Sequence, residues 1–131
     1  MLTQGRDSGS ALVAAAMALV WLSSVINFEA AQAETWRVGG DMGWPFNCSN
    51  WTKGKSFKAG DILEFRYNAE EHDLLVVTKA VYHGCNATAG APAYHTGHDD
   101  IKLVAGHHFF ICNFPGHCKG GYRMAVKVLP N

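Results

Sequence analysis

Three side chains of the sequence could together bind a transition metal. Cys112 opens the run CNFPGHC, His117 follows it five residues later, and His72 lies forty residues upstream. One thiolate and two imidazoles form a trigonal ligand set that suits copper. A thiol-ligated copper ion held inside protein walls carries electrons and does not transform a substrate, so the spacing predicts a redox site.

Each of these residues also has an ordinary structural explanation. His72 could end a strand, Cys112 could be a buried or disulfide-bonded cysteine, and His117 could lie in a surface turn. For any one of them alone, the structural explanation is the better one. Their joint spacing favours the metal site.

Short β-strands are the elements that would position these side chains. β-Branched and aromatic residues gather in runs that are separated by turn residues such as Gly39-Gly40. The runs are 35–38, 62–67, 74–78, 109–112 and 122–129. Apolar and polar residues alternate in two of them, and no stretch after residue 33 has a convincing helical period. The pattern predicts an all-β fold, a two-sheet antiparallel sandwich or barrel.

The ends of two predicted strands could bring the candidate ligands together. His72 lies just before the run 74–78, and Cys112 ends the run 109–112. In the loop that follows, Pro115 restricts the backbone and Gly116 frees it. The loop would then carry His117 to the same point.

The N-terminus has the layout of a secretory signal peptide. Arg6 precedes an apolar stretch, 11–26, and the small-residue run Ala31-Gln32-Ala33 follows. We expect cleavage after Ala33, which separates a signal peptide (1–33) from a single domain of 98 residues (34–131). The apolar stretch has 16 residues, whereas a spanning helix needs about 20, so we expect no membrane anchor and a secreted, extracellular protein.

The charge balance argues against a nucleic-acid partner. The chain has 11 basic and 11 acidic residues, and the predicted domain keeps ten and nine of them. A net charge near +1 gives no strong field that would attract nucleic acid or anionic lipid. We expect a monomer whose partner is a redox protein or another extracellular protein of unknown identity.

All four cysteines lie in the predicted domain, where a secreted chain meets oxidising conditions. If Cys112 is a ligand, the other three can form one disulfide and leave one odd thiol. We favour Cys85 with Cys118, because that bridge would hold the loop of His117 in place. Cys48 lies far upstream in a polar, turn-like stretch and is the expected odd thiol, through which a dimer is an alternative.

Three tripeptides match the acceptor pattern for N-glycosylation. They begin at Asn47, Asn50 and Asn86. The pattern predicts surface loops on a secreted glycoprotein, although the first two sites are too close for both to be filled easily.

Long segments of the chain match a known family. They are WRVGGDMGWPFN, WTKGKSFKAGDILEFRYNAEEHDLLVV, DDIKL and FFICNFPGHCKGGYRMAV, and they span nearly all of residues 34–131. In these segments the chain resembles the phytocyanins, the plant blue-copper branch of the cupredoxins, and most closely the plantacyanins or basic blue proteins. The resemblance implies a cupredoxin-like Greek-key fold and one type 1 copper ion. It also places His72, Cys112 and His117 at the three equatorial ligand positions, with Cys85 and Cys118 at the family's disulfide.

The chain departs from the family at the axial position. The family has a weak Met or Gln ligand five residues after the second histidine, where this chain has Tyr122. Met124 comes two residues too late, and same-face residues of a strand lie about 6.6–6.8 Å apart, so we do not expect it to be a ligand. A neutral phenol is a poor soft ligand, and ionising it would require a sharp fall from its usual pKa of about 10. We expect a three-coordinate copper with the Tyr122 ring shielding its axial side and with a raised reduction potential.

The other histidines match no ligand position of the family. They are His83, His95, His98, His107 and His108. We expect His107 and His108 in a solvated turn, whereas His95 and His98 could bind adventitious metal. Three tryptophans, Trp36, Trp44 and Trp51, are expected to pack in the core or entry loop.

Single-electron transfer is the leading function. The resemblance implies that electrons leave through the His117 ring edge, near an apolar patch of Phe114 and Pro115. The alternative is an extracellular glycoprotein of the cell wall or of cell signalling that keeps the fold but has relaxed or lost copper redox function. We expect no enzyme, because Tyr122 would block the axial position and no acid–base pair is evident.

Overall fold

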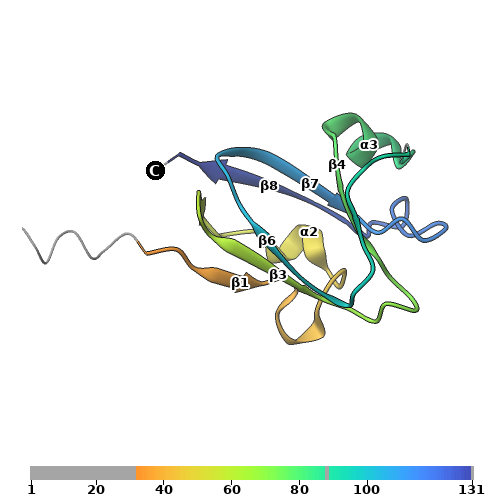
Figure 1. The fold of residues 1–131 in the computed structure, drawn as a ribbon, viewed down its shortest axis with the longest axis horizontal. Coiled ribbons are helices and arrows are strands. Elements are labelled where there is room, and N and C mark those ends of the chain that lie inside the picture. The colour runs from red at the N-terminus through yellow and green to blue at the C-terminus, as the bar shows by residue number, and fades with distance from the viewer. Residues whose placement is uncertain (1–31, 88, 131) are drawn as a thin grey trace, which may run out of the picture. The chain divides into compact units, whose positions relative to one another are not determined.

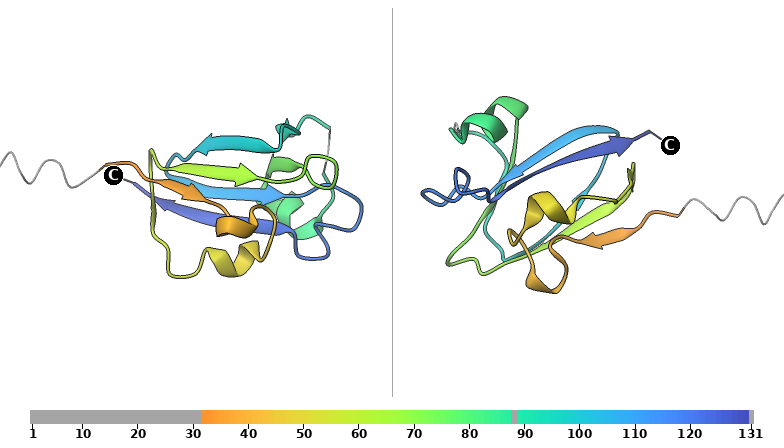
Figure 2. Two further views of the ribbon diagram at one scale, coloured as in Figure 1. Left: turned by 90° about the horizontal axis from the view of Figure 1, so that it is seen from below. Right: turned by 180° about the vertical axis from the view of Figure 1, so that it is seen from behind.

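Eight β-strands form two sheets in the part of the chain that the structure, a computed structural model, describes, residues 32–87 and 89–130. The sheets form two layers, as Figures 1 and 2 show. The first sheet has the order β1 (Thr35–Arg37), β3 (Ile62–Arg66) and β6 (His98–Lys102). The second has the order β2 (Phe57–Lys58), β8 (Arg123–Leu129), β7 (Gly106–Ile111), β4 (Leu74–Val77) and β5 (Ala93–Tyr94). The predicted all-β sandwich is confirmed. Of the signal peptide predicted for 1–33, residues 1–31 lie outside the described part.

The sheets are mixed, so the prediction of a wholly antiparallel sandwich was wrong. β1 runs parallel to β3, and β2 runs parallel to β8, whereas the other pairs are antiparallel. A parallel pair needs a long crossover connection. The segment 38–61 provides one between β1 and β3, because it visits the second sheet as β2 before it returns.

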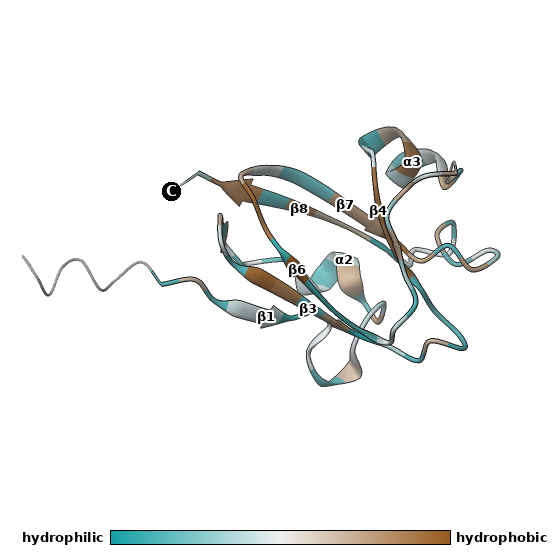
Figure 3. Cartoon of the chain, in the orientation of Figure 1, coloured by the Kyte–Doolittle hydropathy of each residue, from teal (hydrophilic) through white to brown (hydrophobic). Residues whose placement is uncertain are grey.

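The core lies between the two sheets and follows the predicted alternation. Leu63 and Phe65 of β3 are buried, as are Met124, Val126 and Val128 of β8, while the residues between them are more exposed. Figure 3 shows hydrophobic segments along β3, β4 and the end of β7. Strands with one buried face in this pattern fix the register of both sheets.

Three short helical elements were missed. They are the 3-10 helix η1 (Gly40–Met42) and the α-helices α2 (Cys48–Trp51) and α3 (Lys79–Gly84). Six residues or fewer make less than two turns, too short for a hydrophobic period of 3.6 to be visible. A local signal did exist for α3, because Thr78 is its N-cap and accepts a hydrogen bond from the Val81 amide. No helix in the described ranges is long and apolar enough to cross a membrane.

The pair His107–His108 belongs to β7, so the prediction of a solvated turn was wrong. His107 pairs with Lys127 and His108 with Val126 across the β7–β8 ladder. The strand begins at Gly106, three residues before the run of apolar residues that marked it in the sequence. Two polar residues at the outer end of a strand were mistaken for the preceding turn.

Candidate metal centre

His72 and Cys112 meet because their strands are antiparallel neighbours. β4 begins at Leu74 and β7 ends at Ile111, and Leu75 pairs with Ile111. The start of one strand therefore lies beside the end of the other, as the sequence predicted. A turn fixes the residue before β4, since the His72 amide donates to the carbonyl oxygen of Asn68 over 2.9 Å.

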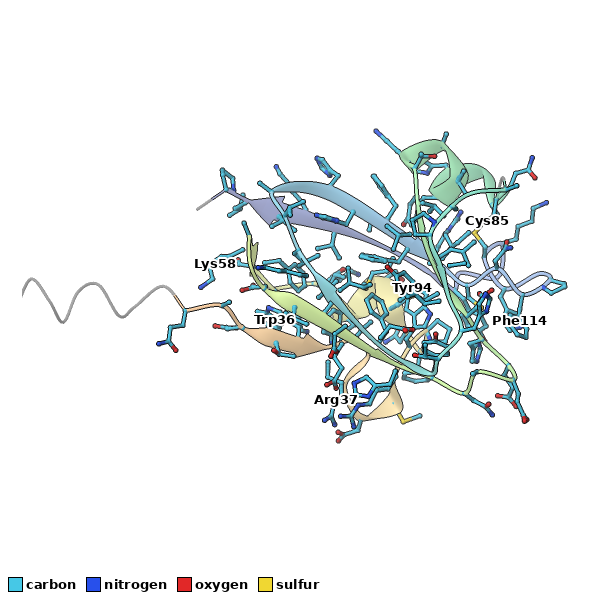
Figure 4. All side chains as sticks on the ribbon, in the orientation of Figure 1. Trp36, Arg37, Lys58, Cys85, Tyr94 and Phe114 are labelled. Carbon is cyan, nitrogen blue, oxygen red and sulfur yellow. A yellow bond between two sulfur atoms is a disulfide. The ribbon has the colours of Figure 1, made fainter. Side chains whose placement is uncertain are left out.

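A hydrogen-bonded loop carries His117 back to Cys112. The His117 amide donates to the Phe114 carbonyl oxygen, and the Tyr122 amide donates to the His117 carbonyl oxygen, each over 3.0 Å. Gly116 has a positive φ of 79°, a conformation in which glycine costs least. This loop lies at the end of the sandwich opposite the C-terminus, where Figure 4 labels Phe114.

The three candidate ligand atoms converge. The Cys112 Sγ lies 3.3 Å from the His117 Nδ1 and 3.7 Å from the His72 Nδ1. All three atoms lie within 4.8 Å of one another. One metal ion could therefore contact the thiolate and both imidazoles, and this soft-sulfur and imidazole donor set suits copper.

Burial controls the protonation of the site. The Cys112 side chain is fully buried, which raises the pKa of its thiol. Burial lowers the pKa of His72, and the nearby His117 lowers it further. At neutral pH the His72 imidazole is therefore neutral, the form that can bind a metal, whereas a metal would have to displace the proton of Cys112.

Asp73, which the sequence did not single out, ties the two halves of the site together. Its side-chain Oδ1 accepts a hydrogen bond of 2.6 Å from the Asn113 amide, next to Cys112. Its backbone carbonyl accepts one of 3.0 Å from the Trp44 indole. The sequence did carry a signal, namely a carboxylate directly before the apolar run LLVV. In the structure that carboxylate is buried. A buried charge at such a position needs hydrogen-bond partners.

Tyr122 covers one side of the site. Its ring is edge-on to His117, with ring centroids 5.1 Å apart, and to His72, at 5.8 Å. The side chain is 39% exposed and lines a hollow of about 310 Å³ together with Met42, Phe46 and His72. The Tyr122 ring therefore lies beside both imidazoles, and His72 reaches the same hollow.

Met124 lies deeper in the sandwich than Tyr122. It pairs with Phe110 across the β7–β8 ladder, whereas Tyr122 is opposite Cys112. Met124 is fully buried and belongs to the main core cluster. One residue pair of the ladder, Ile111 with Arg123, thus lies between the Met124 pair and the Tyr122 pair.

Comparisons with known proteins assign this arrangement to a family. Residues 32–122 match the plastocyanin-like domain family. The basic blue protein of Cucumis sativus is 52% identical over 92 residues, which cover 70% of this chain and 96% of that protein. The chemocyanin of Lilium longiflorum is 41% identical over 123 residues, which cover 94% of this chain and 98% of that protein. The chain belongs to the phytocyanin family.

A solved structure confirms the cupredoxin-like fold of this phytocyanin. The cucumber basic protein, a blue copper protein, superposes with a TM-score of 0.70 at 50% identity. The match covers 72% of this chain and 99% of the cucumber chain. Cucumber stellacyanin gives a TM-score of 0.69 at 28% identity. Expectations of family and fold are therefore both confirmed.

A disulfide holds the ligand loop of this phytocyanin against α3. Cys85 and Cys118 are bonded, as predicted, and Cys118 directly follows His117. Figure 4 labels Cys85 near the loop. Arg123 binds the same region, because its Nη1 donates to the carbonyl oxygens of Tyr82 and His83 at the end of α3. The loop is thus joined to α3 both covalently and by hydrogen bonds.

Cys48 is outside the disulfide, as is the candidate ligand Cys112, but it does not lie in an open turn. It begins α2 and is 1% exposed. Its Sγ donates to the carbonyl oxygen of Arg123 over 2.9 Å, and burial raises the pKa of the thiol. The alternative of a dimer through Cys48 is therefore poorly supported by its burial.

The three candidate glycosylation sites all lie on the surface. Asn47, Asn50 and Asn86 are exposed, and the side-chain amide of Asn50 donates to the Asn47 side chain over 2.9 Å. The contact underlines how close the first two sites are. Their use stays a prediction.

A second group of metal-binding residue types lies on the first sheet. Glu64, His98 and Asp100 offer atoms within 4.8 Å of one another. Glu64 also accepts a hydrogen bond of 3.1 Å from Arg37 and forms an ion pair with Arg66 at 2.9 Å, so its charge is already compensated. The group uses His98 without His95, which the sequence had placed beside it. The arginines make this surface network less suited to a cation than the buried site.

Proposed function

We propose that this phytocyanin binds one type 1 copper ion through His72, Cys112 and His117 and passes single electrons. The observation that carries the proposal is the convergence of one thiol and two Nδ1 atoms within 4.8 Å. The relatives support it, since the cucumber structure is described as a blue copper protein. Copper would supply a one-electron couple between Cu(I) and Cu(II).

The residues of the chain would give the site its rigidity. The loop from Cys112 to Tyr122 is hydrogen-bonded at both of its ends, and Cys118 fastens it to α3. Asp73 accepts from the backbone beside Cys112 and directly follows His72 in sequence. A site held in this way changes little when its charge changes, which favours electron transfer over substrate binding.

Tyr122 would leave the copper three-coordinate. Its ring is edge-on to both imidazoles, so the aromatic group shields the axial side, and a neutral phenol is a weak donor to a soft metal. The loss of an axial donor favours Cu(I). The same shielding argues against an enzyme that would bring a substrate to the metal.

The His117 ring would be the route by which electrons leave. Phe114 stacks on this ring, with centroids 5.8 Å apart and an angle of 26° between the planes. Phe114 is partly buried and Pro115 is exposed, so the loop presents an apolar surface beside the ligand. A redox partner of unknown identity would dock here.

Secretion and glycosylation form part of the same proposal. The sequence pattern of residues 1–33 supports export, and the three acceptor asparagines lie on the surface. We propose that the domain works as an extracellular monomer without a membrane anchor.

The visible absorption spectrum of the 34–131 domain with one equivalent of Cu(II) tests the proposal. We expect an intense thiolate-to-copper band that a mild reductant bleaches reversibly, and no such band in Cys112→Ser. A folded, disulfide-bonded domain without the band would overturn electron transfer.

Tyr122 is also the observation that favours the second candidate, an extracellular glycoprotein that has relaxed its copper function. It replaces the expected axial ligand, and exposed acceptor sites would suit a surface-interaction role. The same spectrum separates the two candidates. A stable blue site with reversible reduction supports the first, and a fold that does not retain copper supports the second.

A further inference from the structure

Asp61 is a fully buried carboxylate at the start of β3. Its Oδ1 accepts a hydrogen bond of 2.9 Å from the backbone nitrogen of Glu34. Its Oδ2 accepts from the Lys58 amide at 2.9 Å and from the Trp36 indole at 3.0 Å. Three N–H groups therefore converge on one charge that has no access to water.

The backbone of Glu34 is hydrogen-bonded to the rest of the domain, while its side chain is exposed. Its nitrogen binds Asp61, and its carbonyl oxygen accepts a hydrogen bond of 2.8 Å from the Ile62 amide. The preceding residue, Ala33, is exposed and has no regular secondary structure. The nitrogen that meets the buried carboxylate is the atom that cleavage after Ala33 would turn into a new N-terminus.

We propose that cleavage of the Ala33–Glu34 bond completes the fold, because the new α-ammonium group of Glu34 forms an ion pair with the buried Asp61. The inference rests on the proposed secretion and does not depend on copper. Hydrolysis adds one water: the Ala33 carbonyl carbon becomes a carboxylate, and the Glu34 nitrogen becomes an amine that is protonated at neutral pH. One of the ammonium protons keeps the direction of the present N–H bond.

The geometry favours this terminus over a shifted one. A distance of 2.9 Å is already that of a charged N–H to carboxylate bond, so cleavage adds a positive charge without moving atoms. An N-terminus one residue earlier would place its amine about 3.3–3.6 Å further along an extended chain. Glu34 would then keep only a neutral amide against Asp61. A buried carboxylate gains more from a paired cation than from a neutral donor.

The charged groups around Asp61 set the pH range of the effect. Burial opposes ionisation of Asp61, but the hydrogen bonds from Glu34, Lys58 and Trp36 outweigh it, and with the positive charge of Lys58 they lower the pKa. Lys58 approaches from β2, and Glu34 adds its own carboxylate at the surface. An α-amine paired with Asp61 should titrate above its ordinary pKa of about 7.7–8.0. Its contribution is complete below that range and is lost as pH rises through the raised value. At the acid end the Asp61 contribution is lost as pH falls through its lowered pKa.

The test compares three forms of the domain: one that begins at Glu34, the same form acetylated at its amine, and one that begins at Ala33. The domain can be studied without residues 1–33, because a solved relative has a similar extent. The match to the cucumber basic protein covers 99% of the cucumber chain but only 72% of this chain. The α-amine pKa is measured from the pH dependence of labelling by an amine-reactive reagent, with mass spectrometry of the N-terminal peptide. Urea midpoints are measured at pH 6 and at pH 10.

We expect the Glu34 amine to titrate at least about one unit above that of the Ala33 form, which corresponds to labelling about tenfold slower at neutral pH. Acetylation should lower the urea midpoint at pH 6 and have little effect at pH 10. Asp61→Asn should remove the difference in amine pKa. If that variant does not fold, the Ala33 form still gives the comparison with Asp61 intact.

Equal amine pKa values in the Glu34 and Ala33 forms would overturn the ion pair. The N-terminus of the chain secreted from its full-length precursor, read by mass spectrometry, tests the cleavage separately. A terminus other than Glu34 would overturn the processing step. The copper absorption band should be the same in all three forms, so a missing band would count against the proposed function alone.

Discussion

The backbone amide of Cys112 donates to the carbonyl oxygen of Tyr122 over 2.9 Å. Cys112 and Tyr122 are therefore cross-strand neighbours at the point where β7 and β8 separate. Directly opposite side chains of an antiparallel pair are in contact. A substitution at Tyr122 should therefore change the surroundings of the Cys112 thiol without disturbing the pairing of β7 with β8.

Replacement of Tyr122 by methionine should lower the reduction potential of the copper site. The thioether would add an axial donor, which stabilises Cu(II) relative to Cu(I). Cyclic voltammetry measures the change, and Tyr122→Phe is the matched control because it keeps the ring and removes only the hydroxyl. The potential of the phenylalanine variant should stay close to that of the original chain. A methionine variant with an unchanged or higher potential would contradict a three-coordinate site.

Copper binding should release about one proton at neutral pH, because a thiol ligand must be deprotonated. Burial raises the pKa of the Cys112 thiol, so the free site holds its proton there, while the lowered pKa of His72 keeps that imidazole neutral. Calorimetry in buffers of different ionisation enthalpy counts the protons. In Cys112→Ser the released proton should be absent. A chain that binds copper without proton release near pH 7 would show that the thiol is not the ligand.

The variant Asp73→Ala should bind copper more weakly, by about 10- to 100-fold, as expected for a residue that orients ligands. It would lose the hydrogen bond from the Asn113 amide and so loosen the backbone beside Cys112. Competition titration with a copper chelator gives the affinity. Asp100→Ala, which removes an exposed carboxylate, is the control. Equal losses in both variants would point to a general charge effect.

Removal of the disulfide by Cys85→Ser with Cys118→Ser should lower the free energy of unfolding by about 2–5 kcal/mol. The bridge closes a sequence separation of 33 residues, and its loss frees the loop that follows His117. Urea denaturation of the metal-free chain measures the effect without copper. An unfolding free energy equal to that of the bridged chain would mean that Arg123 alone holds the loop to α3.

Cys48 should resist alkylation in the folded chain and should not form an intermolecular disulfide. The thiol is buried against the carbonyl oxygen of Arg123, so a reagent can reach it only when α2 opens. Mass spectrometry after iodoacetamide treatment, with and without urea, follows the modification. Rapid modification in the absence of urea, or a reducible dimer, would contradict this placement.

The sequence predicted five of the eight described strands and the three convergent residues because both leave local patterns. It missed the two-residue strands β2 and β5, and β6, whose polar residues lack a β-prone run. Alternation in the run 62–67 marks β3, and the spacing of Cys112 and His117 marks the loop. His72 could be added because it precedes an apolar run that had to be a strand. The family match then supplied the role of these positions.

Other features depended on contacts between distant segments. Asp73 became visible only when β4 lay beside the loop after β7, which put its carboxylate at the Asn113 amide. The two parallel strand pairs follow from a crossover between sheets, and α2 is stabilised by packing that four residues cannot encode. The burial of Asp61 left no local pattern either, because its hydrogen-bond donors come from two separate segments, Glu34 with Trp36 and Lys58.

The hydrogen-bonded loop between Cys112 and Tyr122 also bears on the kinetics of electron exchange. Two of the proposed ligands lie at this loop, which the disulfide of Cys118 and the hydrogen bonds of Arg123 fasten to α3. Atoms that are already fixed need not move when the charge of a bound metal changes, so the reorganisation energy of the proposed site would be low. The rate would then depend on how closely a partner approaches His117, and variants on the docking surface should change that rate more than variants in the core.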